Sequence, residues 1–184
     1  GFGMRFYIET FGCTSNFGNS QDLAEALQEM GHISSGLNEA DMVIVNTCAV
    51  TERTERKILR RLRQLEGERL VVAGCLAAAI PQSIQSLRCR GRLGPLSQGD
   101  ASRIAKLFDG WVMPSQHMQS KQLQSQNFQF EEMLRERHIG VHLRESSPGG
   151  ESCGIVNVAD GCNGSCSYCI VSKARGRLKS RPVE

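Results

Sequence analysis

The run Met42-Val43-Ile44-Val45 decides the fold, and it leads directly into Asn46-Thr47-Cys48. Four apolar residues in a row, without the alternation of a half-buried strand, are typical of a short strand that is buried on both faces of a sheet. A strand of this kind is covered by helices on both sides, which is the arrangement of an α/β domain with a parallel sheet.

The pattern continues outward from this run as repeated strand and helix segments. Strands are predicted at residues 5–9 and 70–73, and apolar residues at helical spacing follow the strands. Repeated units of this kind predict a doubly wound parallel sheet of the Rossmann or flavodoxin type. The helices are expected at residues 21–30 with Ser20 as the N-cap, from Thr51 or Thr54 to about Gly67, from Pro81 to Leu87, and at residues 100–108.

The composition indicates a globular chain whose cysteines are its unusual feature. The 184 residues are 40% hydrophobic and 22% charged, and the net charge of +3 is too small to indicate nucleic-acid binding by itself. The longest apolar run, residues 70–80, is half a membrane span, and the first residues lack the apolar region of a secretory signal. A chain of this size needs no disulfide framework, so we expect a cytoplasmic protein without membrane contact whose eight cysteines stay reduced and bind metal or do chemistry.

The chain divides into three parts. Residues 4–112 hold the repeated strand and helix segments, and residues 1–3, ahead of Met4, resemble vector-derived sequence. Residues 113–150 form a glutamine-rich linker region that includes a candidate helix at 131–138 and ends in Ser146-Ser147-Pro148-Gly149-Gly150. Residues 151–184 contain a predicted strand at 154–159 and are too few to bury a second core, so we expect the start of a truncated domain.

Three cysteines follow the first well-defined strands. Cys13, Cys48 and Cys75, which we call the strand-end cysteines, each come after a predicted strand and before a predicted helix. The loops after parallel strands emerge at one edge of a sheet, so we expect the three thiols to meet, with helix N-termini lowering their pKa values. Three thiolates suit a [4Fe–4S] cluster with one exchangeable iron. Structural zinc sites usually take four ligands, often in close-spaced pairs, and the remaining alternative is three small buried apolar residues.

Three more cysteines lie in one short glycine-rich run. Cys162, Cys166 and Cys169, which we call the loop cysteines, have the spacing C-x3-C-x2-C. Gly161 and Gly164 allow the run to wrap so that three sulfurs face one point. This arrangement supplies three ligands to a cubane cluster and leaves its fourth iron for a small molecule. A zinc loop and a chance cluster of cysteines are the alternatives.

The loop cysteines resemble those of the radical S-adenosylmethionine (SAM) enzymes, whose pattern has an aromatic residue before the last cysteine, where Tyr168 stands here. Together, the two groups of cysteines resemble those of the radical SAM methylthiotransferases. Cys89 and Cys153 are outside this resemblance and have no assigned role. The stretches that carry it are Glu9-Thr10-Phe11-Gly12-Cys13-Thr14-Ser15-Asn16, Asn46-Thr47-Cys48-Ala49-Val50, Ala73-Gly74-Cys75-Leu76-Ala77, Ala174-Arg175-Gly176 and Ser180-Arg181-Pro182.

The resemblance implies a fold, two [4Fe–4S] clusters and a mechanism. Residues 4–112 would be the N-terminal methylthiotransferase domain, and residues 151–184 the start of a truncated radical SAM (β/α) barrel. The cluster on the loop cysteines would bind SAM, with Tyr168 nearby, and cleave it to a radical that removes hydrogen from the target carbon. The cluster on the strand-end cysteines would present sulfur that a second SAM methylates. An electron-donor protein of the flavodoxin or ferredoxin type is also implied, and the truncated chain alone is expected to be inactive.

The resemblance also indicates the substrate. Members of the family act on adenosine 37 of tRNA that carries an isopentenyl or a threonylcarbamoyl group, or on an aspartate of a ribosomal protein. The run Ala174-Arg175-Gly176-Arg177-Leu178-Lys179-Ser180 is most similar to the archaeal and eukaryotic branch, which modifies N6-threonylcarbamoyladenosine in tRNA to its 2-methylthio derivative. The alternatives are the other two substrates, and a non-catalytic iron–sulfur or zinc-binding module.

A basic segment lies beside the loop cysteines. It contributes +5 with no acidic residue, so the rest of the chain carries −2 of the net charge of +3. Concentrated positive charge next to the site suits contacts to tRNA phosphates, and the alternative is an ordinary solvated strand or helix. The residues are Lys173, Arg175, Arg177, Lys179 and Arg181.

Overall fold

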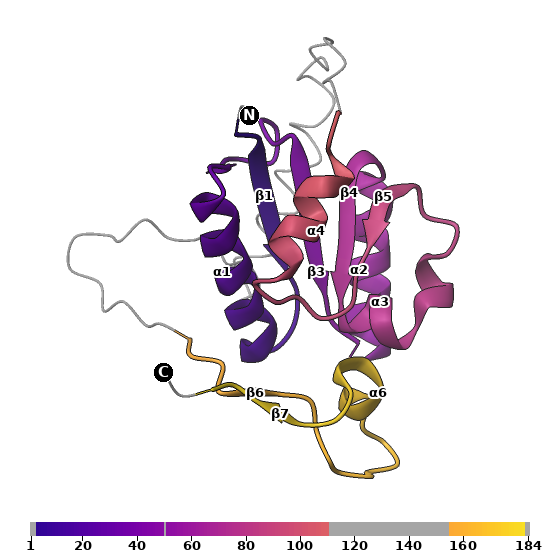
Figure 1. The fold of residues 1–184 in the computed structure, drawn as a ribbon. Coiled ribbons are helices and arrows are strands. Elements are labelled where there is room, and N and C mark those ends of the chain that lie inside the picture. The colour runs from indigo at the N-terminus through magenta and orange to yellow at the C-terminus, as the bar shows by residue number, and fades with distance from the viewer. Residues whose placement is uncertain (1–2, 50, 111–154, 183–184) are drawn as a thin grey trace, which may run out of the picture.

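The computed structural model describes residues 3–49, 51–110 and 155–182. Within these residues, five parallel strands form one sheet in the order β2-β1-β3-β4-β5 (Figure 1). This is the strand order of flavodoxin-like folds, and it confirms the predicted doubly wound sheet. The strands are β1 (Arg5–Thr10), β2 (Ile33–Ser34), β3 (Met42–Thr47), β4 (Gly67–Gly74) and β5 (Cys89–Arg92).

The central strand is β3, and all six of its residues are buried, as its apolar run predicts. Ile44 lies opposite Ile8 of β1 on one side and Val71 of β4 on the other. Successive side chains of a strand point to opposite faces. Val43 and Val45 therefore pack in one core, and Ile44 packs in the other.

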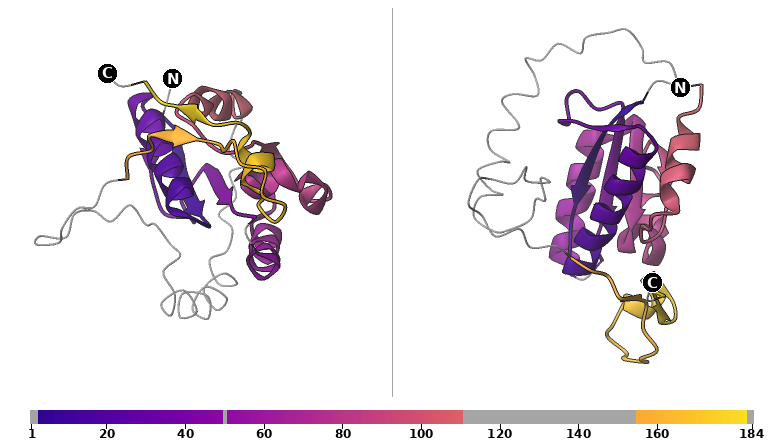
Figure 2. Two further views of the ribbon diagram at one scale, coloured as in Figure 1. Left: turned by 90° about the horizontal axis from the view of Figure 1, so that it is seen from below. Right: turned by 60° about the vertical axis from the view of Figure 1, so that its left-hand side comes forward.

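Helices cover both faces of the sheet in the described residues (Figure 2). On one face lie α1 (Thr14–Glu29) and α4 (Asp100–Leu107), and on the other lie α2 (Glu52–Leu65) and α3 (Cys75–Ala79). The apolar side chains that these helices bury against the sheet include Leu23, Leu27 and Ile104 on the first face, and Ile58, Leu62 and Leu76 on the second.

The helix α1 begins at Thr14, well before the predicted start at residue 21, and its N-cap is Cys13 rather than Ser20. Its first turns bury Asn16, Asn19 and Ser20, whose side chains make hydrogen bonds instead of apolar contacts. Apolar spacing therefore cannot reveal this half of the helix.

The other helices follow the predictions with one exception. Thr51 is the N-cap of α2, and its Oγ1 accepts a hydrogen bond from the backbone N–H of Thr54 at 3.2 Å. The helix predicted from Pro81 to Leu87 is wrong, because α3 already begins at Cys75 and Pro81 opens only a 3-10 helix, η1 (Pro81–Ile84). Between them Ile80 has φ −134° and ψ 56°, since a residue before proline disfavours the helical region.

Residues 155–182 lie across the carboxyl end of the sheet (Figure 1). There β6 (Ala159–Asp160) pairs antiparallel with β7 (Lys179–Ser180), and α6 (Val171–Arg175) contacts α3. The strand predicted at 154–159 is therefore shorter, because residues 155–158 are not in a strand. The predicted linker at 113–150, with its candidate helix, lies outside the described residues. No helix in the described ranges is both long and apolar enough to span a membrane.

Acidification is expected to weaken the amino-terminal edge of the sheet through His32. The backbone N–H of Met4 donates to His32 Nδ1 at 3.2 Å, and burial lowers the pKa of His32 below its ordinary value of 6.5. The neutral imidazole therefore contributes stability that is complete above pH 6.5 and is lost as the pH falls through the lower folded pKa. The unfolding free energy should fall between pH 7 and pH 5, and in H32Q this fall should be smaller by up to about 1 kcal/mol. Urea titration at the two pH values measures the difference. Identical pH dependence in the variant would contradict this prediction.

Candidate metal centre at the carboxyl edge of the sheet

The strand-end cysteines lie in the loops that leave three adjacent parallel strands. Cys13 is the N-cap of α1 after β1, Cys48 follows β3 directly, and Cys75 opens α3 directly after β4. The strand order reverses between β1 and β3, and open α/β sheets bind ligands outside the carboxyl ends of strands at such a point. Cys13 is exposed, whereas Cys48 and Cys75 are buried, and all three are free thiols.

Two glycines allow the cysteine loops to come close together. Gly12 has φ +124°, and a Cβ there would lie 2.7 Å from Cys48 Cβ and 2.9 Å from Cys48 Sγ. Gly74 has φ +97°, and a Cβ there would overlap the carbonyl oxygen of Thr47 and lie 2.5 Å from Asn46 Oδ1. The backbone beside Cys13 therefore contacts the Cys48 side chain, and the backbone before Cys75 contacts the end of β3.

Substituting G74A is expected to destabilise the protein by about 2–3 kcal/mol. The added Cβ would strain a left-handed backbone and also collide with the end of β3. G31A is the matched control, because Gly31 has φ +87° and nothing within 4 Å of its Cβ position. That control should lose only the strain, about 1 kcal/mol. Urea unfolding measures both variants, and equal losses would refute the close contact at Gly74.

Asn16 joins the loops of the strand-end cysteines. Its Nδ2 donates to the carbonyl oxygens of Phe11 at 2.8 Å and Thr47 at 3.0 Å. Its Oδ1 accepts from Arg175 Nη2 at 2.6 Å and lies 3.8 Å from Cys75 Sγ. The side chain thus contacts the backbone before Cys13, the backbone before Cys48 and the thiol of Cys75. Asn16 belongs to the stretch around Cys13 that carries the family resemblance, but no sequence pattern assigned it this role.

A buried polar layer supports Asn16 from below. Asn46 Nδ2 donates to the carbonyl oxygen of Asn16 and to Ser20 Oγ, both at 2.9 Å, and Thr10 Oγ1 donates to Ser20 Oγ at 2.8 Å. Asn19 Nδ2 and Asn46 Oδ1 are buried without a hydrogen-bond partner among the described residues. The floor of the site is therefore polar, in contrast to the apolar cores on the two faces of the sheet.

Burial raises the pKa of the Cys75 thiol, and the nearby guanidinium of Arg175 opposes this rise. The expectation that a helix N-terminus would lower the thiol pKa is therefore wrong for Cys75. Its helix, α3, is only five residues long, and the loss of solvent around the thiolate is the largest cause of the raised pKa. A metal that binds Cys75 must displace its proton.

The loop cysteines lie between β6 and α6, in a run that turns back on itself. Gly164 N–H donates to Cys162 Sγ at 3.2 Å, and a Cβ at Gly164 would lie 3.3 Å from Cys162 Sγ and 3.9 Å from Cys166 Sγ. The backbone N–H of Cys169 donates to the carbonyl oxygen of Cys166 at 3.2 Å. Two of the three sulfurs thus flank Gly164. Tyr168, expected near SAM, is 90% exposed.

The donor set of the two proposed sites consists of six thiols, without a carboxylate or an imidazole. Thiolate ligands suit iron–sulfur clusters and zinc. No group of three or more His, Cys, Asp or Glu in the described part of the chain is placed to hold a metal ion. A cubane cluster binds each cysteine through a different iron, so its ligands stand farther apart than those of one ion. The thiol chemistry fits such clusters, and the ligand sets stay predictions.

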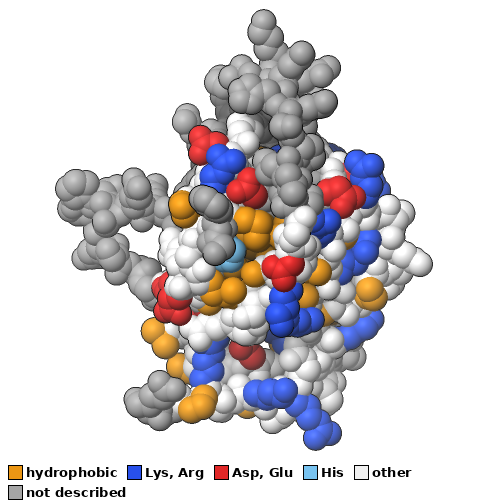
Figure 3. Space-filling model, turned by 45° about the horizontal axis from the view of Figure 1, so that its top comes forward, with side chains coloured by type: hydrophobic (Ala, Val, Ile, Leu, Met, Phe, Trp, Pro, Cys, Tyr) orange, Lys and Arg blue, Asp and Glu red, His pale blue; other side chains and the backbone are white. Residues whose placement is uncertain are grey.

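The basic residues that were predicted to contact RNA fall into two groups, three that are exposed and two that form ion pairs. Lys173, Arg177 and Lys179 are exposed. The Arg175 side chain is only 6% exposed and pairs with Asp160 at 2.7 Å, so it is placed to hold the fold rather than a phosphate. Arg181 Nη2 pairs with Asp22 at 2.7 Å. On the face of the molecule in Figure 3, Lys and Arg side chains are interspersed with Asp and Glu.

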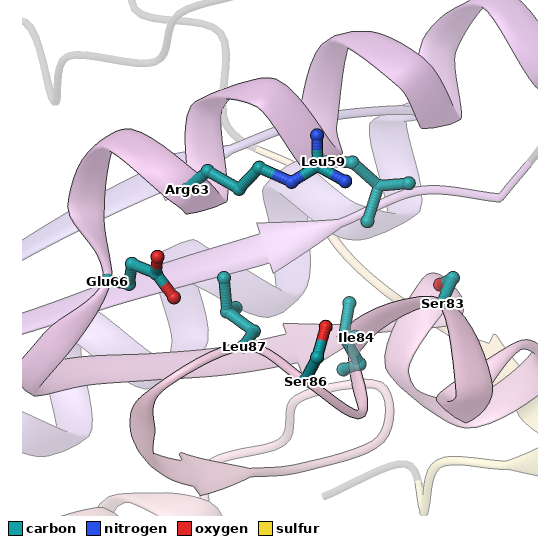
Figure 4. A pocket seen from close by; sticks show the side chains of 7 residues that line it. All are labelled: Leu59, Arg63, Glu66, Ser83, Ile84, Ser86 and Leu87. Carbon is teal, nitrogen blue, oxygen red and sulfur yellow. The ribbon is translucent and has the colours of Figure 1, made fainter.

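A small hollow of about 120 Å³ lies between α2 and the segment that includes η1 (Figure 4). None of the six cysteines lines it, and its walls mix apolar, hydroxyl and charged groups, so it is separate from the proposed centre. The lining residues are Leu59, Arg63, Glu66, Ser83, Ile84, Ser86 and Leu87.

Comparison with known proteins gives a consistent result. Residues 5–90 match the family described as "Uncharacterized protein family UPF0004". The chain is 34% identical over 99% of its length to the probable threonylcarbamoyladenosine tRNA methylthiotransferase of Methanothermobacter thermautotrophicus, of which it spans 40%. It is 32% identical over 96% of its length to the Archaeoglobus fulgidus protein of the same name, of which it spans 38%. It is 30% identical over 98% of its length to the tRNA-2-methylthio-N(6)-dimethylallyladenosine synthase of Porphyromonas gingivalis, of which it spans 38%.

The chain thus spans 40% or less of the length of these relatives, and the similarity extends along nearly all of the chain itself. Over the length that it spans, the chain is similar to tRNA methylthiotransferases, and residues 5–90 match the UPF0004 family.

Proposed function

We propose that this chain is part of an enzyme that methylthiolates N6-threonylcarbamoyladenosine at position 37 of tRNA. The observation that carries the proposal is the position of the strand-end cysteines, which follow the neighbouring strands β1, β3 and β4 of one parallel sheet. The segment with the loop cysteines lies across the same end of the sheet. The names of the two archaeal relatives support this substrate class.

Two [4Fe–4S] clusters and SAM are the proposed cofactors, one cluster on the strand-end cysteines and one on the loop cysteines. When bound, they supply a radical that removes hydrogen from an unactivated carbon, and sulfur for insertion at that carbon. The chain's own residues set the geometry of the sites. Asn16 fixes the backbone before Cys13 and before Cys48, and the thiols of Cys48 and Cys75 are buried whereas that of Cys13 is exposed.

The exposed basic residues of the second segment are the proposed tRNA contacts. Lys173, Arg177 and Lys179 lie beside the loop cysteines in sequence and are open to solvent. Positive charge there would hold phosphates, while an unpaired loop adenosine reaches the site. An electron-donor protein of the flavodoxin or ferredoxin type and a cytoplasmic location belong to the same proposal.

Nucleoside mass spectrometry of tRNA tests the proposal. Cells that lack the gene should lose the 2-methylthio group from threonylcarbamoyladenosine and regain it when the full-length gene is restored. Loss from the dimethylallyl nucleoside instead would favour the alternative substrate, which the Porphyromonas gingivalis relative supports. An unchanged nucleoside profile would contradict both.

The 184-residue chain by itself is proposed to be inactive, because it spans only about two fifths of its relatives. An anaerobic assay of this chain with tRNA, SAM and a strong reductant measures this directly. Multiple turnovers would show that the present length suffices for catalysis.

A further inference from the structure

Within the described residues, the hydrogen bonds of the Arg175 side chain link the run that holds the loop cysteines to the helix that follows Cys13. Its Nη1 donates to Asp160 Oδ1 at 2.7 Å. Its Nη2 donates to Asn16 Oδ1 at 2.6 Å and to Asn19 Oδ1 at 2.9 Å. The guanidinium is almost completely buried, although its partners are separated from it by up to 159 residues in sequence.

The bond to Asp160 closes the run that holds the loop cysteines. Asp160 ends β6 just before that run, and Arg175 ends α6 just after it. The backbone N–H of Cys162 donates to the carbonyl oxygen of Gly176 at 3.0 Å, which closes the same loop through the backbone. The two ends of the run are therefore held together at its base.

The bonds to Asn16 and Asn19 fasten this base to α1. Asn16 in turn donates to the carbonyl oxygens of Phe11 and Thr47, beside two of the strand-end cysteines. A continuous set of hydrogen bonds thus leads from one group of cysteines to the other. A planar guanidinium donates from separate nitrogens in a fixed geometry, whereas a lysine donates from a single nitrogen.

Other contacts place the same segment on the same face of α1. Arg181 Nη2 pairs with Asp22 Oδ2 at 2.7 Å, and a Cβ at Gly18 would lie 2.5 Å from Asn157 Nδ2. Asn19 and Asp22 are three residues apart on the helix, as Asn16 and Asn19 are, so the partners form a polar stripe. This stripe explains why the start of α1 is polar and yet buried.

We infer that Arg175 is a positioning residue that sets the separation of the two cysteine sites. The docking of the segment stands on the hydrogen bonds alone, while its purpose, to hold two clusters at a fixed separation, rests on the proposed function. This role replaces the predicted contact of Arg175 with RNA.

Hydrogen exchange of the metal-free, reduced chain tests the docking. R175M removes the guanidinium, and R177M removes an exposed one from the same segment as a matched control. We expect the amides of Cys162, Ala174 and Gly176 to exchange at least about 100-fold faster in R175M, because several charge-assisted hydrogen bonds are lost. The amides of β3 should stay protected, and R177M should match the wild type. Wild-type exchange in R175M, or the same acceleration in R177M, would overturn the inference.

Two further variants keep the test valid if R175M does not fold. N19A removes one of the two amide acceptors on α1, and it should accelerate exchange of the same amides by about three- to tenfold. R175K keeps the positive charge but not the forked guanidinium group, and the same amides should exchange much faster in it than in the wild type. Wild-type protection in N19A and R175K would show that the bonds of Arg175 do not hold the segment.

Iron-loaded protein distinguishes positioning from mere structure. With both clusters present and reduced, their magnetic interaction depends on their separation, and electron paramagnetic resonance detects it. R175M should alter this interaction while the iron content stays equal to that of R177M. An unchanged interaction would overturn the positioning role. Failure of both proteins to bind iron would instead refute the proposed function, and the hydrogen-exchange result would still decide the docking.

Discussion

Replacing Cys13, Cys48 and Cys75 together by alanine is expected to halve the iron bound after anaerobic reconstitution, from about eight to about four atoms per chain. The hydrogen bonds that close the run of the loop cysteines come from Arg175 to Asp160 and from Cys162 to Gly176, not from the strand-end cysteines, so the second cluster should remain. Iron and acid-labile sulfide assays measure the change. In the proposed methylthiotransferase the same triple variant should keep SAM cleavage and lose methylthiolation completely.

Cys89 supplies the matched control for this experiment. It is the first residue of β5 and therefore lies at the amino end of the parallel sheet, opposite the strand-end cysteines. C89A should retain about eight iron atoms per chain. Loss of all iron in the triple variant, or loss of SAM cleavage along with methylthiolation, would contradict the proposed division of labour. Zinc in place of iron in the wild-type chain would favour the non-catalytic module.

The position of the strand-end cysteines at one edge of the sheet could be predicted because it depends on local patterns. The apolar run that begins at Met42 specifies a buried strand, and a parallel sheet then brings every strand-to-helix loop to one edge. The start of α2 was predicted at Thr51 or Thr54, and Thr51 is the capping residue, whose side chain bonds a neighbour in sequence. Gly12 and Gly74 stand directly before two of these cysteines, and the close approach of the backbone at both was not among the expectations.

Features that depend on distant partners could not be predicted. Arginine is a residue type that usually lies on the surface. Only the contacts of Arg175 with Asn16 and Asn19 make its burial possible. The strand β5 shows the same effect, because Arg90 has partners that are distant in sequence. Arg90 lies over the ring of Phe108 at 5.2 Å, and its Nη1 donates to Glu68 Oε2 at 3.4 Å. Polar residues that are satisfied by distant groups leave no periodic pattern in the sequence.

R61A is expected to destabilise the protein by about 3–5 kcal/mol, a large part of the 5–15 kcal/mol that is typical of a whole domain. Arg61 on α2 donates to Glu9 on β1 through Nε, at 2.9 Å from Oε1, and through Nη2, at 2.8 Å from Oε2. The two side chains are only 8% and 12% exposed. Removing the guanidinium therefore leaves a carboxylate buried without its partner, which costs far more than an exposed ion pair would.

The position of this pair gives the expected loss a functional consequence. Glu9 precedes the loop of Cys13, and Arg61 lies in the helix that follows Cys48, so the pair fixes two of the proposed ligand loops. Urea unfolding of R61A should be compared with that of R60A, because Arg60 is exposed on the same helix and its loss should cost under about 0.5 kcal/mol. The double variant E9L/R61M should recover to within about 1 kcal/mol of the wild type, because no buried charge is then left alone. Equal losses in R61A and R60A, or a double variant as unstable as R61A, would show that the ion pair does not fix β1 to α2.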